Sequence, residues 1–204
     1  MQRAVEAGAE ETGVSVAYTV LEMDAGPVLA AERAPVPPDA TSAELLDALF
    51  ARGADLLLDA LPDALSGAAA ARATPQDPAG ATQAPKLSQA EAELDFDLPA
   101  QQVHNKVRAF EGWPGTRATF QLEDPAGNGP AEPVVIKVLE TRVSREALGH
   151  DFQDRRVQLT KAGQLLVACG GGTVLEVLRL QPPTKKAMDP RSYYNGLRGK
   201  CLAL

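Results

Sequence analysis

The sequence is poor in cysteine, histidine and aromatic residues, and these shortages exclude several classes of protein. Two cysteines and two histidines among 204 residues do not stand at metal-ligand spacing, so we expect neither a disulfide framework nor a bound metal. No uninterrupted apolar run approaches the roughly 20 residues of a membrane helix. The N-terminus, with Glu6, Glu10 and Glu11, lacks the layout of a signal peptide and the arginine content of a transit peptide. We therefore expect a globular protein without a targeting peptide.

Basic residues are scarce in the first half of the chain. Residues 1–100 contain 5 basic and 17 acidic side chains, whereas residues 101–204 contain 15 basic and 10 acidic ones. The overall net charge of −7 conceals this asymmetry. The second half is therefore a candidate for binding an anion such as RNA. Surface charges that merely solvate the protein explain the same counts equally well, so charge alone leaves both interpretations open.

Residues 1–66 have the pattern of the last part of an α/β domain. A short helix is predicted over 2–8, and two strands rich in Val and Ala over 13–20 and 28–36. Thr41 and Glu44 form a capping box that predicts the start of a longer helix. The apolar residues of that helix are expected to share one face until a proline at position 62 interrupts the pattern: Leu45, Leu46, Leu49, Leu56, Leu57 and Ala60.

Residues 67–87 are predicted to be an inter-domain linker. The segment is rich in Ala, Pro and Gly and has no periodicity, so we expect it to have nothing to pack. Order is predicted to resume in a second domain over 88–204, where Ser88 and Glu91 form another capping box. A helix is predicted over 99–110 with Val103 and Val107 facing inward.

The remainder of the second domain has the spacing of short strands. Five are predicted, with a turn over 125–130: residues 117–122, 134–143, 156–160, 164–169 and 173–180. Five strands with short connections favour a small closed barrel of the oligonucleotide-binding (OB) type. The run Gly170-Gly171-Gly172-Thr173 lacks the pattern of a phosphate-binding loop and indicates a hairpin turn. Asp189 and Pro190 predict the start of a final short helix.

Asp24 is the most informative single residue. It stands in the run Leu21-Glu22-Met23-Asp24-Ala25-Gly26-Pro27-Val28-Leu29, between two predicted strands. Asp, Gly and Pro are turn formers, so the tetrapeptide alone predicts only a turn. Together with the preceding run Thr12-Gly13-Val14-Ser15-Val16, however, it resembles the end of the catalytic domain of folate-dependent formyltransferases, in which an Asp of this turn is catalytic. The resemblance implies that role for Asp24.

Three further segments are similar to the methionyl-tRNA formyltransferase family and occur in that family's order. They are Ala84-Pro85-Lys86-Leu87-Ser88 at the joint between domains, the run from Asn105 to Gly115 around Glu111-Gly112-Trp113-Pro114, and the run from Leu180 to Met188 around Pro183-Thr184-Lys185-Lys186. The resemblance covers essentially the entire chain. It implies an α/β fragment, the end of a Rossmann-like formyltransferase domain, followed by an all-β OB-like barrel domain with flanking helices.

The resemblance also implies substrates and partners. The formyl donor would be 10-formyltetrahydrofolate, the acceptor methionyl-initiator tRNA, and the protein a monomer without a metal or a membrane partner. Its location would be the cytoplasm in a bacterium and the mitochondrion or plastid in a eukaryote. The basic side chains that we expect to contact tRNA phosphates are Lys185, Lys186, Arg108, Lys106, Lys86 and Arg191.

One part of the family pattern does not occur in this sequence. The family has a catalytic Asn and His upstream of the helix that corresponds to residues 2–8, and neither His104 nor His150 matches that motif. We therefore expect formyl transfer by this chain alone to be near background, and a less stable N-terminal segment beside a folded barrel. Two alternatives remain: a non-catalytic RNA-binding or interaction protein, and a folate-dependent formyltransferase that acts on a small molecule. The compact Asp24 turn suits the second of these, but the C-terminal motifs do not. For Trp113, packing between helix and barrel is a better interpretation than base stacking.

Overall fold

The computed structural model of the chain describes residues 1–126, 129–146 and 156–204, which divide into two compact units. Unit 1 comprises residues 9–86 together with Met1 and Arg3. Unit 2 comprises residues 87–204 together with Gln2 and residues 4–8. Within the described ranges, every helix is too short or too polar to cross a membrane.

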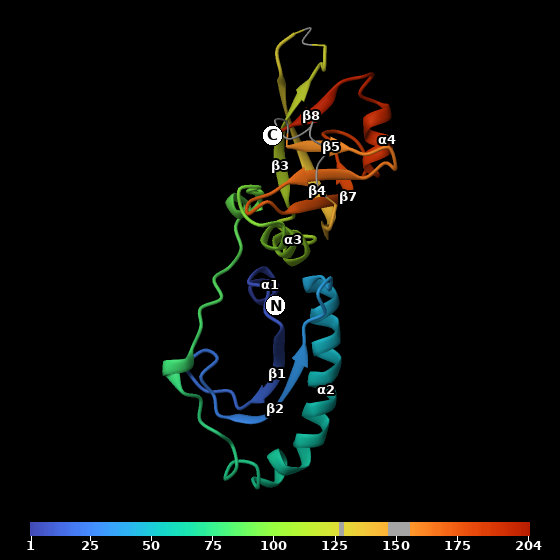
Figure 1. Cartoon of the computed structure of the whole chain (residues 1–204). Coiled ribbons are helices and arrows are strands. Elements are labelled where there is room, and N and C mark those ends of the chain that lie inside the picture. Colours follow the sequence, from blue (N-terminus) through green and yellow to red (C-terminus); the bar gives the residue numbers. More distant parts are fainter. Residues whose placement is uncertain (127–128, 147–155) are drawn as a thin grey trace. The chain divides into compact units, whose positions relative to one another are not determined.

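Unit 1 is built from an antiparallel hairpin and one long helix (Figure 1). Strand β1 (Glu11–Ala17) pairs with β2 (Val28–Pro35), and α2 (Ser42–Ser66) packs on both strands. The capping box predicted at the start of α2 is confirmed. The Glu44 backbone N–H donates to Thr41 Oγ1 at 3.3 Å, and the Thr41 N–H donates to the Glu44 carboxylate at 2.9 Å. Local sequence therefore sets the point at which this helix begins.

Two details of α2 differ from the prediction. The helix continues through Pro62 to Ser66 and ends at Gly67, whose φ of 79° places it in the left-handed region that favours glycine. A proline costs an interior helix one hydrogen bond but does not by itself end it. In addition, Leu46 and Leu57 do not join the buried face, because they are 41% and 46% exposed.

The predicted linker packs on unit 1 over its first half, which corrects the expectation that it has nothing to pack. Ala69 is fully buried, and its N–H donates to the Asp63 carbonyl at 3.0 Å. Thr74 and Val28 exchange two backbone hydrogen bonds of 2.8 Å. The short side chains of this segment permit close approach, and backbone hydrogen bonds hold it although it has no periodic pattern. A 3₁₀ turn, η1 (Pro78–Gly80), follows.

Unit 2 contains a six-stranded antiparallel sheet in the described residues. Its order is β5 (Val157–Leu159), β6 (Leu165–Ala168), β7 (Val174–Gln181), β4 (Glu132–Ser144), β3 (Arg117–Glu123) and β8 (Cys201–Ala203). The outer strands β5 and β8 contact each other, so the sheet curls into a nearly closed barrel. This confirms the expected barrel and its five predicted strands, and adds β8. The predicted turn over 125–130 lies partly outside the described residues.

The core of the barrel is apolar and is covered by α3 (Ala100–Ala109), which contacts β4 and β7. Val103 and Val107 are 2% and 3% exposed, which confirms their predicted inward orientation. Large side chains that are almost fully buried fill the interior: Phe110, Phe120, Ile136, Leu165, Leu175, Leu180 and Leu202. Burial of this apolar surface is the main source of stability of unit 2.

Three short helices complete unit 2. Helix α1 (Gln2–Glu6) contributes the fully buried Val5, and η2 (Gln89–Ala92) begins at the predicted capping box of Ser88 and Glu91. Helix α4 (Pro190–Asn195) begins as predicted at Asp189, whose carboxylate accepts from the Ser192 N–H at 2.8 Å. Hydrogen bonds from Ser192 lower the pKa of the Asp189 carboxyl.

The glycine run at 170–172 forms a turn between β6 and β7, as predicted. A Cβ atom at Gly170 would lie 1.9 Å from the Asp97 carbonyl oxygen, so a side chain does not fit there. The run serves close packing of backbone against backbone rather than phosphate binding.

Candidate functional site

The Asp24 loop connects β1 to β2 and is held mainly by its backbone. The Tyr18 N–H donates to the Pro27 carbonyl at 3.0 Å and closes the base of the loop. Gln76 Nε2 donates to the carbonyl oxygens of Asp24 at 2.8 Å and of Gly26 at 2.7 Å. A Cβ atom at Gly26 would lie 1.6 Å from the Tyr18 carbonyl oxygen, so glycine is required at that position. The packed part of the 67–87 segment thus fixes the shape of this turn.

The side chain of Asp24 is exposed, and its backbone has a φ of 57°. Aspartate tolerates this left-handed conformation better than most residues. Within the described part of the chain, the Asp24 carboxylate has no hydrogen bond or ion pair to another side chain. The loop therefore presents a carboxylate from a fixed turn, which can accept a proton or orient a neighbouring group.

His104 does not supply a catalytic partner by its local structure. His104 is 4% exposed on α3, with Nδ1 3.0 Å from Thr141 Oγ1, so its ring is part of the interior of unit 2. His150 lies outside the described residues. In the described ranges, no three His, Cys, Asp or Glu side chains lie close enough together to hold a metal ion.

Four of the six side chains expected to contact tRNA are exposed. Lys185 and Lys186 lie on the loop between β7 and α4, and Gln181 Nε2 donates to the Lys185 carbonyl at 2.9 Å. Arg191 is exposed on α4, and Lys86 is exposed at the end of unit 1. The exposed ammonium and guanidinium groups of these residues are accessible to an anionic ligand.

Arg108 is a correction, because the structure places it in the interior. Its side chain is 6% exposed and donates to Asn105 Oδ1 at 2.9 and 3.2 Å and to the Val5 carbonyl at 3.5 Å. This arginine joins α3 to α1 and does not face solvent. Lys106 is half-buried, and its Nζ donates to the Glu93 carbonyl at 2.7 Å above the ring of Phe110. The sequence shows that both residues are charged. It does not show that other segments of unit 2 cover the face of α3 on which they lie.

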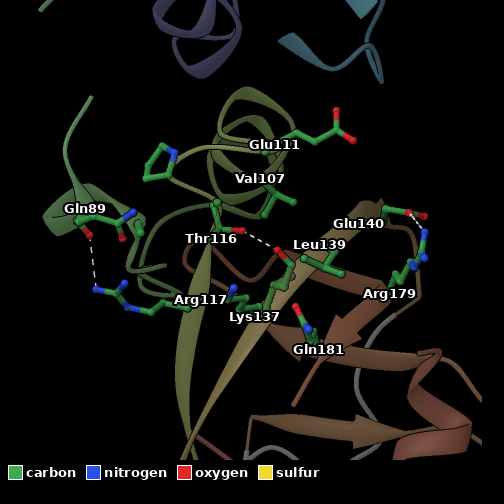
Figure 2. Close-up of a pocket in the computed structure, with 15 residues that line it drawn as sticks. Gln89, Val107, Glu111, Thr116, Arg117, Lys137, Leu139, Glu140, Arg179 and Gln181 are labelled. Atoms are coloured by element: carbon green, nitrogen blue, oxygen red, sulfur yellow. Dashed lines mark hydrogen bonds and ion pairs between the residues drawn. The ribbon is translucent and has the colours of Figure 1, made fainter. Parts of the chain in front are cut away.

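A cavity of about 450 Å³ opens on unit 2 where β3, β4 and β7 meet the end of α3 (Figure 2). Arg117, Lys137 and Gln181 are direct neighbours across the three strands, so they form one row on one face of the sheet. The Lys137 side chain is exposed and makes no ion pair with another described residue. Figure 2 shows Lys137 beside Arg117, with Gln181 rising from the adjacent strand.

The other two cations of this cavity are paired. Arg117 Nε lies 3.0 Å from Glu93 Oε2, and Arg179 Nη1 lies 3.0 Å from Glu140 Oε1. Lys137 therefore supplies the cation that remains available to a polar or anionic ligand. Sequence reasoning missed this residue because it stands inside an apolar strand, where only the strand register reveals its neighbours.

Trp113 is 55% exposed, which corrects the expectation that it is a packing anchor. It follows α3 in the turn that also contributes Gly112 and Pro114 to the cavity. More than half of the residue's surface remains open to solvent, so packing accounts for only part of this side chain.

The class of this protein follows from its two units. The first is a hairpin with one long helix, and the second is a nearly closed barrel with an exposed basic loop. The family profile described as "Formyl transferase, C-terminal domain" matches residues 86–198, and the profile "Formyl transferase" matches residues 1–61. The first match alone covers more than half of the chain. The chain belongs to the formyltransferase family.

Curated relatives of the chain are methionyl-tRNA formyltransferases. The protein of Methylobacterium sp. (strain 4-46) is 39% identical over 97% of this chain and 58% of the relative. The protein of Lactobacillus delbrueckii subsp. bulgaricus is 34% identical over 100% of this chain and 59% of the relative. The chain therefore spans about three-fifths of the length of these relatives.

Solved structures support the fold. HypX from Aquifex aeolicus in complex with tetrahydrofolic acid has a TM-score of 0.60 and 16% identity, over 96% of this chain and 32% of that chain. The N-formyltransferase from Helicobacter canadensis with folinic acid and dTDP-3-aminofucose has a TM-score of 0.60 and 11% identity, over 88% of this chain and 58% of that chain. At these identities the likeness concerns the fold alone.

Proposed function

We propose that this chain is the larger part of a methionyl-tRNA formyltransferase, which transfers a formyl group from 10-formyltetrahydrofolate to the amino group of methionyl-initiator tRNA. The observation that carries the proposal is the 34–39% identity to curated methionyl-tRNA formyltransferases along nearly the entire chain. Folate ligands in two solved structures of similar fold are consistent with a tetrahydrofolate-type donor.

The proposed reaction explains why a carboxylate is needed at the Asp24 turn. The amino nitrogen attacks the formyl carbon, the new C–N bond forms, and the bond from that carbon to N10 of the folate breaks. The tetrahedral intermediate carries an oxyanion that requires hydrogen-bond donors, and the attacking amine must lose a proton while the departing nitrogen gains one. Asp24 acts in this proton transfer by orienting a partner group. Its fixed backbone and exposed carboxylate suit that role.

Unit 2 holds the tRNA in this proposal. Lys185 and Lys186 contact phosphates from their exposed loop, and Arg191 on α4 adds a further cation of the same unit. Lys86, at the end of unit 1, makes a separate contact with the RNA. Contacts of this kind provide affinity that depends on salt but not on base sequence. Lys106, already held by the Glu93 carbonyl, contributes less.

A formyl-transfer assay of the 204-residue chain tests the catalytic part. With 10-formyltetrahydrofolate and methionyl-tRNA, we expect a rate near background, because the sequence supplies the Asp24 turn without the family's Asn and His motif. Adding the part of the Methylobacterium relative that lies outside the match is expected to restore activity. In that mixture, Asp24→Asn should lower the rate at least about a hundredfold, in the range of a lost acid-base contribution.

Glu22→Gln is the matched control, because Glu22 is another exposed acid of the same loop. Its rate should equal that of the parent mixture. Equal rates for Asp24→Asn and the parent would remove Asp24 from the mechanism. Formyl transfer by the chain alone at the rate of the full-length relative would refute the need for the additional residues.

A second candidate function is RNA binding without catalysis. The observation that favours it is the exposed Lys185-Lys186 loop on a barrel that has an apolar core of its own. It predicts tRNA binding by the chain and no formyl transfer in the mixture, so the same assay separates it from the first candidate.

A further inference from the structure

The proposed function gives no role to the cavity where β3, β4 and β7 meet the end of α3. Its volume of about 450 Å³ lies within the range of about 300–1,000 Å³ that is usual for small-molecule sites. All the residues that line it, from Gln89 to Gln181, belong to unit 2. One unit therefore forms the walls of a concave site of ligand size.

One end of the cavity is cationic. Lys137 stands between Arg117 on β3 and Gln181 on β7 in a row of directly paired residues, and neighbours in such a row lie roughly 5 Å apart. Lys137 is exposed and makes no ion pair or side-chain hydrogen bond within the described part of the chain. Its ammonium alone offers three donors, so this end suits an anionic group with several oxygens.

An acidic side chain lines the cavity away from that row. Glu111 follows α3 and is exposed, and its carboxylate has no hydrogen bond or ion pair to another described residue. Figure 2 shows Glu111 apart from Lys137 and directed away from it. The two arginines of the cavity are each paired with a glutamate. A ligand thus meets an available cation at one end and an available hydrogen-bond acceptor at the other.

Apolar side chains lie between these two ends. Val107 and Val138 are 3% and 1% exposed, and Leu139 and Pro114 are half-buried. Figure 2 shows Val107 and Leu139 in the space that separates Glu111 from the row of the sheet. An apolar wall of this kind packs against the face of a flat ring, and the burial of that ring contributes to affinity.

We propose that this cavity binds a nucleoside monophosphate whose base carries an amino group. The phosphate accepts hydrogen bonds from Lys137, and the base packs on Val107 and Leu139. The amino group of the base donates to the Glu111 carboxylate. The ligand carries its anion, ring and donor in the same order as the cavity carries the groups that complement them. The inference goes beyond the proposed function, which assigns no nucleotide site to unit 2.

Other ligands match the cavity less well. An α-amino acid carries its ammonium and carboxylate on one carbon, whereas Lys137 and Glu111 lie apart. Inorganic phosphate would meet Lys137 but would leave the apolar wall uncovered. The bases of a nucleic acid duplex are stacked and paired, so they do not enter a cavity of this kind.

A nucleotide has two sources, a free mononucleotide and an unstacked nucleotide of single-stranded RNA. Gln181 Nε2 donates to the Lys185 carbonyl at 2.9 Å, so the cavity adjoins the loop that we expect to contact RNA. The chemistry in the cavity is the same for both sources, and the experiment distinguishes them.

The test is equilibrium dialysis of the full 204-residue chain against radiolabelled adenosine monophosphate (AMP), with adenosine and inorganic phosphate as competitors. Lys137→Gln removes the cation of the cavity. Lys161→Gln is the matched control, because Lys161 is an exposed lysine in the turn between β5 and β6. Thermal unfolding verifies that both variants keep the stability of the parent.

We expect Lys137→Gln to bind AMP at least about tenfold more weakly, as the loss of a charged hydrogen bond implies, and Lys161→Gln to bind it like the parent. AMP should bind more tightly than adenosine or inorganic phosphate. No binding of AMP, equal affinity for adenosine or inorganic phosphate, or equal binding by Lys137→Gln would overturn the inference.

Glu111→Leu tests the other end of the cavity by the sign of its effect. If the carboxylate accepts from the base, the variant binds AMP more weakly than the parent. If the carboxylate only adds negative charge, its removal strengthens the binding of an anion. Binding that is stronger than that of the parent, or equal to it, would therefore contradict the proposed contact.

A single-stranded hexanucleotide of adenylate identifies the source of the nucleotide. If the cavity serves RNA, the hexanucleotide displaces labelled AMP at a lower concentration than unlabelled AMP does. If the cavity serves a free mononucleotide, unlabelled AMP is the better competitor. Either result supports a nucleotide site. The dialysis does not depend on formyl transfer, so its failure would leave the proposed function standing.

Discussion

Single residues show that positive charges serve two purposes in unit 2. Arg108 is buried and donates to Asn105 and Val5, whereas Lys185 and Lys186 extend into solvent. Buried charge that satisfies carbonyl and amide oxygens supports the fold, while exposed charge remains free to meet an anion. Arg108 should therefore affect stability and the lysine pair should affect RNA affinity.

Arg108→Ala is expected to lower the free energy of unfolding of unit 2 by roughly 1–3 kcal/mol, because it removes buried hydrogen bonds to Asn105 and Val5 and leaves a void where the side chain packed. Arg191→Ala, at an exposed position of α4, should stay within about 0.5 kcal/mol of the parent. Urea denaturation followed by fluorescence of the single tryptophan measures both. An unfolding midpoint of Arg108→Ala equal to that of the parent would contradict the structural assignment.

The two cysteines should differ in reactivity. Cys169 is 7% exposed, and burial raises the pKa of its thiol to about 11, so at pH 8 it is protonated and shielded. Cys201 is only half-buried. Iodoacetamide labelling followed by mass spectrometry should modify Cys201 first and Cys169 only upon unfolding. Equal labelling rates in the native protein would show that the barrel opens more readily than its packing indicates.

At the scale of elements, α2 depends on its cap and on packing along one face. Thr41→Ala removes the side-chain acceptor of the Glu44 N–H and is expected to cost about 1 kcal/mol. Hydrogen exchange of the amides in the first turns of α2 should accelerate about fivefold, as this free energy implies. Thr82→Ala changes an exposed threonine outside any helix and should leave exchange unchanged. An unaltered rate in Thr41→Ala would mean that packing alone holds this end.

Elements that depend on local signals were predictable, and elements that depend on distant partners were not. The caps at Thr41 and Asp189 and the inward residues Val103 and Val107 follow from short-range patterns. The three-residue strand β8 exists only because it pairs with β3, about 80 residues earlier in the chain. Such a short strand has no periodicity of its own, so sequence alone does not reveal it.

In the candidate site, too, the features that depend on distant partners could not be predicted from the sequence. The shape of the Asp24 loop depends on Gln76, which lies about 50 residues later in a segment without pattern. Lys137 becomes a candidate only when register places it between Arg117 and Gln181. Arg108 was misjudged because helical spacing reveals a polar face but not which polar residues a neighbouring helix covers.

For the whole molecule, the uneven distribution of charge agrees with the proposal that the first part of the chain serves catalysis and the second part binds RNA. Residues 1–100 are strongly acidic and include the Asp24 turn, while residues 101–204 carry an excess of basic side chains. An excess of positive charge on the second part would attract RNA, whereas the acidic first part would repel its phosphates. RNA binding would thus rest mainly on the second part of the chain.

The most direct test of the account is the affinity of the 204-residue chain for methionyl-initiator tRNA, measured across a range of salt concentrations. We predict binding that weakens as salt rises, with a slope of log K against log salt that decreases in magnitude by about 1–2 when Lys185→Ala and Lys186→Ala are combined. Arg33→Ala with Lys161→Ala, which removes two exposed charges elsewhere, should change the slope less. No measurable binding, or an unchanged slope in the lysine-pair variant, would contradict the account.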